Sequence, residues 1–189
     1  MTADRSTPPC AWPEVRERLA ALAAADPLLR RFGAGSHRYV LRPTLSEAAV
    51  TSFETQHRIT LPRSYRSFLL EVADGGTGPA HGLLGLTELP PDDDALFDLK
   101  SESLTPGFLA SPFPHLTAQP GPSAGTNYDL AGSLAIGESG CGTFSRLVVT
   151  GPCAGQVWTD DQVWTALAPG PDFRDWYTAW LDLRQQSGP

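Results

Sequence analysis

The segment that decides the fold is 132–161, GSLAIGESGCGTFSRLVVTGPCAGQVWTDD. It predicts three short β-strands, at 133–138, 143–150 and 156–159, joined by two glycine-rich turns. The middle strand has apolar side chains on both alternations, with Phe144 and Val148 on one and Leu147 and Val149 on the other. A strand that is apolar on both faces is usually covered on both. We therefore expect the middle strand at the centre of a sheet.

The turn between the first two predicted strands is Ser139-Gly140-Cys141-Gly142. Glycine takes positive φ without a Cβ clash, so this composition suits a tight hairpin. The letters also come close to the G-x-S-x-G elbow of hydrolases, with Cys141 in place of the last glycine. That elbow needs a helix after its serine, whereas a strand is predicted here. We interpret the segment as a structural turn and assign no catalytic residue.

Helical patterns lie on both sides of the predicted strands. Apolar residues at spacings of three and four predict a helix over 12–25, after a flexible tail at 1–11. Ser46, whose hydroxyl can cap free amides, opens a second helix, and Pro62 opens a third. Short extended pieces are expected at 39–41 and 82–86, with a turn at 32–35.

A last helix is expected from Pro171 and Asp172, with Phe173, Trp176 and Trp180 on its apolar face. The order is helices, then strands, then a helix, without a regular β-α-β alternation. This order predicts the α+β class, with a mostly antiparallel sheet and helices packed against it. We expect one domain over 12–189.

A proline-rich stretch at 90–128 interrupts these patterns. It opens with Asp92, Asp93 and Asp94 and continues with prolines at 106, 112, 114, 120 and 122. Proline removes a backbone donor and breaks both helices and ladders. We expect a surface excursion without a long helix.

Composition narrows the class of protein. The formal net charge is −7 and the sequence pI is about 5.0, which argues against nucleic-acid binding because phosphate contacts need clustered lysine and arginine. No apolar run approaches the roughly 18 residues of a membrane span, and the N-terminus lacks the layout of a secretory signal. We therefore expect a cytoplasmic protein that binds neither nucleic acid nor membrane.

Metal and cofactor motifs are not found in the sequence. Cys10, Cys141 and Cys153 lack zinc-like spacing, which favours free thiols in a reducing compartment. The four histidines show no H-x-x-x-H or H-x-H pairing. The acidic runs lack the alternating spacing of a calcium loop. We predict no metal and no cofactor.

Carboxylates concentrate in two segments that we expect to be loops. The candidate partner-binding residues are Asp92, Asp93, Asp94, Asp160, Asp161 and Trp164. Trp164 is not part of a periodic apolar pattern, so we take it as the candidate surface anchor. If the carboxylates lie on one side of the sheet, they form a negative patch that attracts a basic protein. The plainer alternative is that this charge only keeps the chain in solution.

Three segments carry a resemblance to a known family. They are LSEAAVTSFETQHRITLPRSYRSFLLEVADGGTGPAHGLLGL (45–86), the hairpin block 132–161, and the aromatic pattern F-x-x-WY-x-x-WL (173–181). Together they resemble the SUKH superfamily in its Smi/Knr branch, which is named for a fungal cell-wall synthesis regulator and is abundant in bacteria. The resemblance covers most of 45–183.

The resemblance implies a non-catalytic α+β protein-binding domain. Many bacterial members are immunity proteins that neutralise a polymorphic toxin, and fungal members are regulatory interaction modules. Our first hypothesis is therefore an immunity protein whose partner is a toxin domain, a basic one if the acidic surface binds it. The alternative is an intracellular regulatory or scaffolding module with an endogenous protein partner.

Overall fold

Six helices and four strands are found in the computed structural model, which describes residues 12–91, 93–119, 128–163 and 167–182. In chain order they are α1 (Pro13–Ala25), α2 (Ala34–His37), α3 (Glu47–His57), α4 (Arg63–Glu71), α5 (Asp94–Ser103), β1 (Ser133–Gly140), β2 (Thr143–Val148), β3 (Val157–Asp161), β4 (Leu167–Ala168) and α6 (Phe173–Asp182). The α+β class is confirmed. The predicted tail at 1–11 lies outside the described residues.

The sheet is antiparallel with the strand order β1-β2-β3-β4. β2 lies between β1 and β3, so its predicted central place is confirmed. Leu147 and Val149 belong to the main core, whereas Phe144 and Val148 belong to two smaller clusters on the opposite face. Both faces of β2 are therefore covered. The two-residue strand β4 was not predicted.

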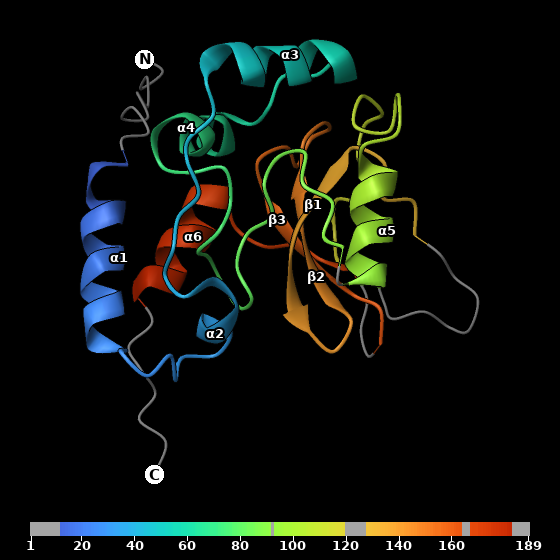
Figure 1. Ribbon diagram of the computed structural model, residues 1–189. Helices are drawn as coiled ribbons and strands as arrows, with labels where there is room; N and C mark the ends of the chain where they lie inside the picture. Colours follow the sequence, from blue (N-terminus) through green and yellow to red (C-terminus); the bar gives the residue numbers. More distant parts are fainter. Residues whose placement is uncertain (1–11, 92, 120–127, 164–166, 183–189) are drawn as a thin grey trace, which may run out of the picture.

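The elements form three layers (Figure 1). Helices α1, α3, α4 and α6 bury their apolar faces with one side of the sheet in the main core. α5 lies on the other side, where Leu96 packs with Ala135 and Phe144. A second small cluster covers the same side of the sheet. Its centre is Phe113 and Trp158, whose ring centroids are 5.1 Å apart.

Most helix starts agree with the sequence. Ser46 caps α3, because its Oγ accepts a hydrogen bond from the Ala49 amide at 3.2 Å. Pro62 precedes α4, and Trp12 is the residue before α1. The indole of Trp12 packs edge-on against Phe68, at 5.4 Å between centroids. Trp180 is buried in the core as predicted, and Trp176 packs partly buried against it.

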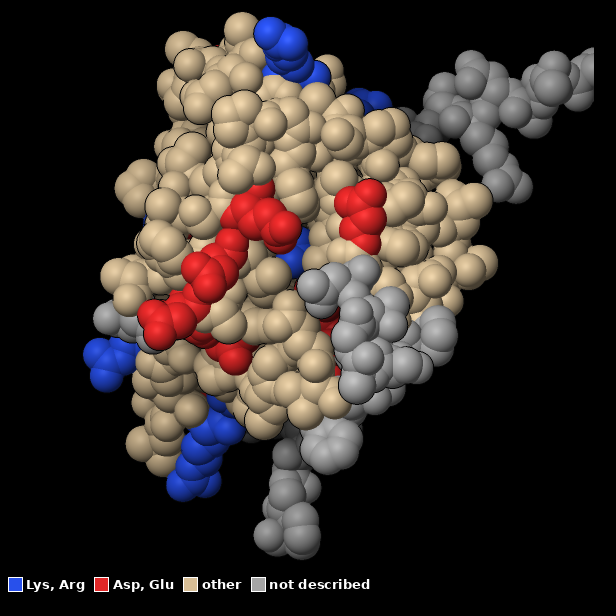
Figure 2. All heavy atoms as spheres, turned by 90° about the vertical axis from the view of Figure 1, so that its right-hand side faces the viewer, with Lys and Arg blue, Asp and Glu red and all other residues tan. Residues whose placement is uncertain are grey.

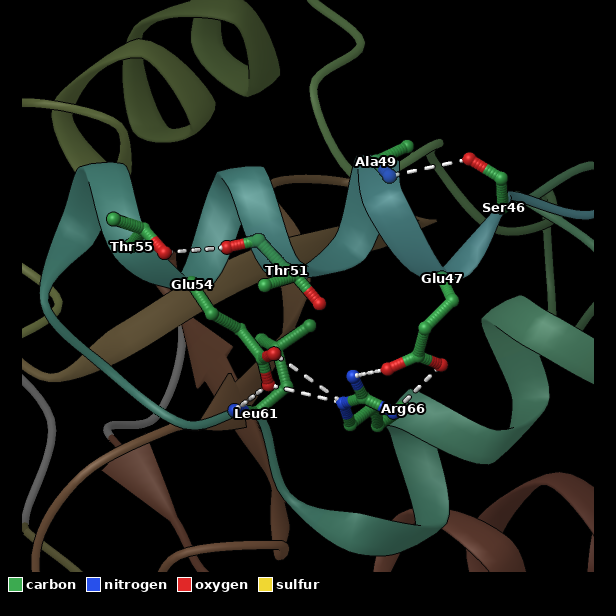
Figure 3. Close-up of polar contacts among 8 residues, drawn as sticks. All are labelled: Ser46, Glu47, Ala49, Thr51, Glu54, Thr55, Leu61 and Arg66. Atoms are coloured by element: carbon green, nitrogen blue, oxygen red, sulfur yellow. Dashed lines mark hydrogen bonds and ion pairs between the residues drawn. The ribbon is translucent and has the colours of Figure 1, made fainter.

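Arg66 joins α3 to α4 (Figure 3). Its guanidinium donates to both oxygens of Glu54, at 3.2 and 3.3 Å, and forms an ion pair with Glu47. Glu54 also accepts the Leu61 amide at 2.9 Å, which fixes the loop between the two helices. The hydrogen bond from Arg66 lowers the pKa of the Glu47 carboxyl.

The stretch at 90–128, where we expected a surface excursion without a long helix, contains the ten-residue helix α5, and this helix is packed against the sheet. The prolines that suggested the prediction start only at 106, and 92–105 contains none. Asp93 is the N-cap, its carboxylate accepting the Leu96 amide at 2.9 Å. Asp93 and Asp94 therefore begin a helix rather than lying in a solvated turn.

Two smaller predictions also differ from the structure. The expected strand at 82–86 is only a bridge between Leu83 and Gly76, although the Leu84 amide donates to Ile136 of β1 at 2.9 Å. The expected turn at 32–35 continues into α2. Gly33 has φ 77°, and a Cβ there would come within 1.8 Å of the Ala80 carbonyl oxygen, so only glycine fits.

Candidate functional site

The outer face of α5 carries a line of carboxylates. Asp94, Asp98 and Glu102 are exposed and follow one another at a spacing of four residues, which places them on one side of a helix. At a rise of 1.5 Å per residue the line is about 12 Å long. We call these three residues the acidic ridge. Figure 2 faces this side of the molecule and shows acidic side chains in a band across it.

The acidic ridge has no ion-pair partner among the described residues. The carboxylates that form ion pairs with arginines lie elsewhere in the chain: Glu47 and Glu54 with Arg66, Glu88 with Arg42, Asp160 with Arg146 and Asp182 with Arg18. Like charges four residues apart on a helix destabilise it by about 0.2–0.5 kcal/mol per pair. These repulsions are not relieved by an ion pair among the described residues; only Asp94, in the first turn of α5, gains from the helix dipole.

Side chains on the inner face of α5 attach the helix to β1, and this leaves the acidic ridge on the solvent side. Leu96 is buried, and the Lys100 ammonium donates to the Ala135 carbonyl at 3.1 Å. The Ser103 hydroxyl accepts the Ala135 amide at 3.3 Å. β1 is the first strand of the sheet, so these side chains satisfy backbone groups at its free edge. This attachment fixes the rotation of α5 about its axis.

The predicted partner-binding residues do not form one patch. Asp94 is on the acidic ridge, and Asp93 is beside it as the cap of α5. Asp161 ends β3, where strand alternation places it on the face of Val157, opposite to α5. Its carboxylate accepts the Val163 amide at 3.0 Å. Asp92 and Trp164 lie outside the described residues.

The prediction that Asp160 lies in a solvated acidic turn is wrong. Asp160 is 5% exposed and accepts a hydrogen bond from Arg146 Nε at 2.8 Å, inside the layer between the sheet and its covering segments. Arg146 is fully buried on β2, on the same alternation as Phe144 and Val148. An unpaired guanidinium there would be very unfavourable, so Asp160 serves as its counter-charge.

An open cleft of about 330 Å³ lies next to the N-terminal half of α5. Its polar lining comes from Ser36, His37, Arg42, His81, Glu88 and Glu138, and its apolar lining from Val40, Leu83, Leu84 and Leu96. Leu96 is on the inner face of α5, so the helix that carries the acidic ridge on its outer face also forms part of the cleft wall. Sequence reasoning missed the cleft, because its walls come from four separate segments.

Two histidines in the cleft differ in their surroundings. His37 is buried, and its Nδ1 accepts the Tyr39 amide at 3.1 Å. Burial, then the charges of Arg31 and His81, lower the pKa of His37 to about 4, so it is neutral at pH 7. His81 is exposed, and its Nδ1 lies 3.0 Å from the Ser36 hydroxyl.

The Ser36–His81 pair lacks the rest of a nucleophilic site. Among the described residues no carboxylate hydrogen-bonds the other nitrogen of His81, so no third group orients the imidazole. The 137–141 segment runs from β1 into the turn before β2, as predicted, rather than into a helix. Cys141 is an exposed free thiol at that turn, with φ 53°.

No group of three or more histidine, cysteine, aspartate or glutamate side chains is placed to hold a metal ion within the part of the chain that the structure describes. In the same part, no helix is both long enough and apolar enough to cross a membrane.

A scan against protein-family models finds no match for this chain, and searches of curated proteins and of solved structures find none either. The resemblance to the SUKH superfamily therefore stays a prediction.

Glu102 and Lys100 are the residues of this site that sequence reasoning missed. A signal was present: Asp93 stands three residues before Leu96, and Leu96, Leu99, Lys100 and Ser103 recur at helical spacing. That pattern predicts a helix, and the same helix would have aligned Asp94, Asp98 and Glu102.

Proposed function

We propose that this chain is a non-catalytic protein-binding domain that docks a basic protein partner on the acidic ridge. The observation that carries the proposal is the line of three exposed carboxylates on α5 without any counter-charge among the described residues. Unpaired like charges cost stability. A partner that supplies positive charge would compensate this repulsion in the complex.

The ridge suits fast association. A row of carboxylates on a chain of net charge −7 attracts a basic surface over about a Debye length, roughly 10 Å at 0.1 M salt. Nuclease toxins bind phosphates and so present basic surfaces. Combined with the SUKH resemblance, this favours an immunity protein that covers the nucleic-acid site of a toxin in the cytoplasm.

The test uses the C-terminal domain of the protein encoded next to this chain's gene. That domain is expressed in a bacterial host, with or without this chain, and growth is followed. We expect the domain to arrest growth and this chain to restore it. The triple variant Asp94→Lys, Asp98→Lys and Glu102→Lys should fail to restore growth although it folds.

Three results separate the possibilities. Rescue by the triple variant at wild-type level would place the interface elsewhere and overturn the role of the ridge. A stable complex without growth arrest by the partner would instead favour a regulatory or scaffolding module. No complex with the neighbouring product in any assay would remove the immunity proposal.

A further inference from the structure

The cleft beside α5 contains one carboxylate that has no partner among the described residues. Three charged side chains line it: Arg42, Glu88 and Glu138. Arg42 and Glu88 form an ion pair, and Glu88 also accepts the Gly85 amide at 2.8 Å. Glu138 is half-buried at the end of β1, and its carboxylate has no partner among the described residues. The lining therefore has one uncompensated negative charge.

The rest of the cleft is suited to the apolar part of a long side chain. Leu83 and Leu96 are buried, and Val40 is 63% exposed beside them. A volume of about 330 Å³ is at the small end of ligand pockets. It has room for one long side chain but not for a helix or a strand.

The rim presents an aromatic ring to solvent. Phe32 is 66% exposed, and its ring contacts the His81 imidazole edge-on at 5.3 Å. Both side chains lie near the β1–β2 turn, because a Cβ on Gly140 would be 3.5 Å from His81 Nε2 and 3.7 Å from Phe32. An exposed aromatic face attracts cations, and guanidinium more often than ammonium.

We propose that the cleft receives one arginine side chain of the basic partner, with its guanidinium paired to Glu138 and its methylene groups between Val40 and Leu83. This inference rests on the proposed function. Arginine fits better than lysine because its planar head is weakly hydrated, binds a carboxylate through two N–H groups and stacks on aromatic rings. Neutral His37 does not repel it.

The experiment is an NMR titration of the ¹⁵N-labelled full chain with N-acetyl-arginine-N-methylamide. The matched probe is the citrulline analogue, which has the same length and no charge. We expect the arginine probe to shift the amides of Gly82, Leu84, Gly137 and Glu138 with a millimolar Kd, and the citrulline probe to bind at least about tenfold more weakly. A tenfold change corresponds to about 1.4 kcal/mol.

Two variants make the result specific to the cleft. Glu138→Gln keeps the shape of the side chain and should weaken the arginine probe about tenfold. Val40→Trp at the exposed rim should block it. The triple ridge variant should bind the arginine probe within about threefold of wild type, because the probe does not need the ridge.

Failure of this inference is distinguishable from failure of the proposed function. Equal binding of the two probes, or an unchanged Kd in Glu138→Gln, overturns the arginine cleft while a ridge-dependent complex with the whole partner still stands. A partner complex that is indifferent to the ridge triple variant removes the proposed function, whatever the probes do.

Discussion

Lys100 is the single lysine of the chain, and its ammonium group is fully buried against β1. It has three N–H donors and makes one hydrogen bond among the described residues, to the Ala135 carbonyl. Burial lowers its pKa to about 7 from 10.5, and the nearby charges of Asp74 and Glu88 counteract this only in part. Between these pH values the unfolded chain binds a proton that the folded chain does not. The folded state therefore gains stability as the pH rises from 7 towards about 10.

Replacing this lysine tests that argument. Lys100→Met should remove the pH dependence and raise the unfolding free energy at pH 7 by a few kcal/mol. About 1–3 kcal/mol of this is offset, because the Ala135 carbonyl loses its donor. Urea unfolding at pH 7 and 9.5 measures both effects. Leu99→Met, on the neighbouring position of α5, is the control for repacking, and a wild-type pH slope in Lys100→Met would contradict the assignment.

Asp160 and Asp161 give a second comparison at the residue scale. Asp160→Asn leaves the buried Arg146 without a counter-charge, and Arg146 Nη2 already lacks a hydrogen-bond partner. We expect a loss of about 3 kcal/mol. Asp161→Asn should cost clearly less, since Asp161 is only half-buried and an amide oxygen can still accept the Val163 amide. Equal denaturant midpoints for the two variants would show that the buried ion pair does not stabilise the fold.

At the scale of elements, the sequence was most informative where the hydrophobic pattern was strong. The alternation in 143–150 predicted both faces of β2, and the core side chains are where that alternation puts them. The helix at 94–103 was missed although its buried residues recur at helical spacing, because two of them, Lys100 and Ser103, are polar. They are buried to satisfy backbone groups of β1, which no local pattern reveals.

The central strand is tested by an apolar-to-charged substitution. Val148→Asp places a carboxylate in a site with no exposed surface, and we expect a loss of several kcal/mol and of the cooperative thermal transition. Val163→Asp is the matched control, because Val163 is 54% exposed. A melting midpoint of Val148→Asp that equals that of Val163→Asp would contradict the central position of β2.

For α5, stability and binding should change in opposite directions. Asp98→Lys lies four residues from both Asp94 and Glu102, so it replaces two repulsive pairs with two attractive ones. We expect a gain of about 0.8–2 kcal/mol in unfolding free energy together with weaker partner binding. Thermal melts and titration with the partner measure the two effects. A variant that is more stable and binds the partner as tightly as the wild type would show that the ridge is not a docking surface.

At the scale of the whole molecule, charge alone did not indicate which carboxylates share one surface. The net charge of −7 directed the prediction to the acidic segments. However, Asp160 forms a buried ion pair with Arg146, and Asp161 lies on the face of the sheet opposite to α5. These differences depend on contacts between residues far apart in sequence. The surface that the fold presents is the acidic ridge, to which Glu102 adds a carboxylate from the C-terminal turn of α5.

The last prediction concerns the rate of association with the basic partner. Reversal of Asp94, Asp98 and Glu102 to lysine adds two charge units at each position and changes the net charge from −7 to −1. Reversal of Glu14, Glu17 and Glu71 makes the same change on the exposed surfaces of α1 and α4. Because screening limits attraction to about 10 Å at 0.1 M salt, we expect only the ridge triple to slow association by about tenfold or more.

Stopped-flow measurements at several salt concentrations separate local from global effects. For the wild type and the α1/α4 triple, the association rate constant should fall steeply with added salt, as expected for steering by a local field. For the ridge triple it should be low and nearly independent of salt. If both triples slow association equally, net charge rather than the ridge guides the partner; if neither does, the carboxylates on α5 have no part in the encounter.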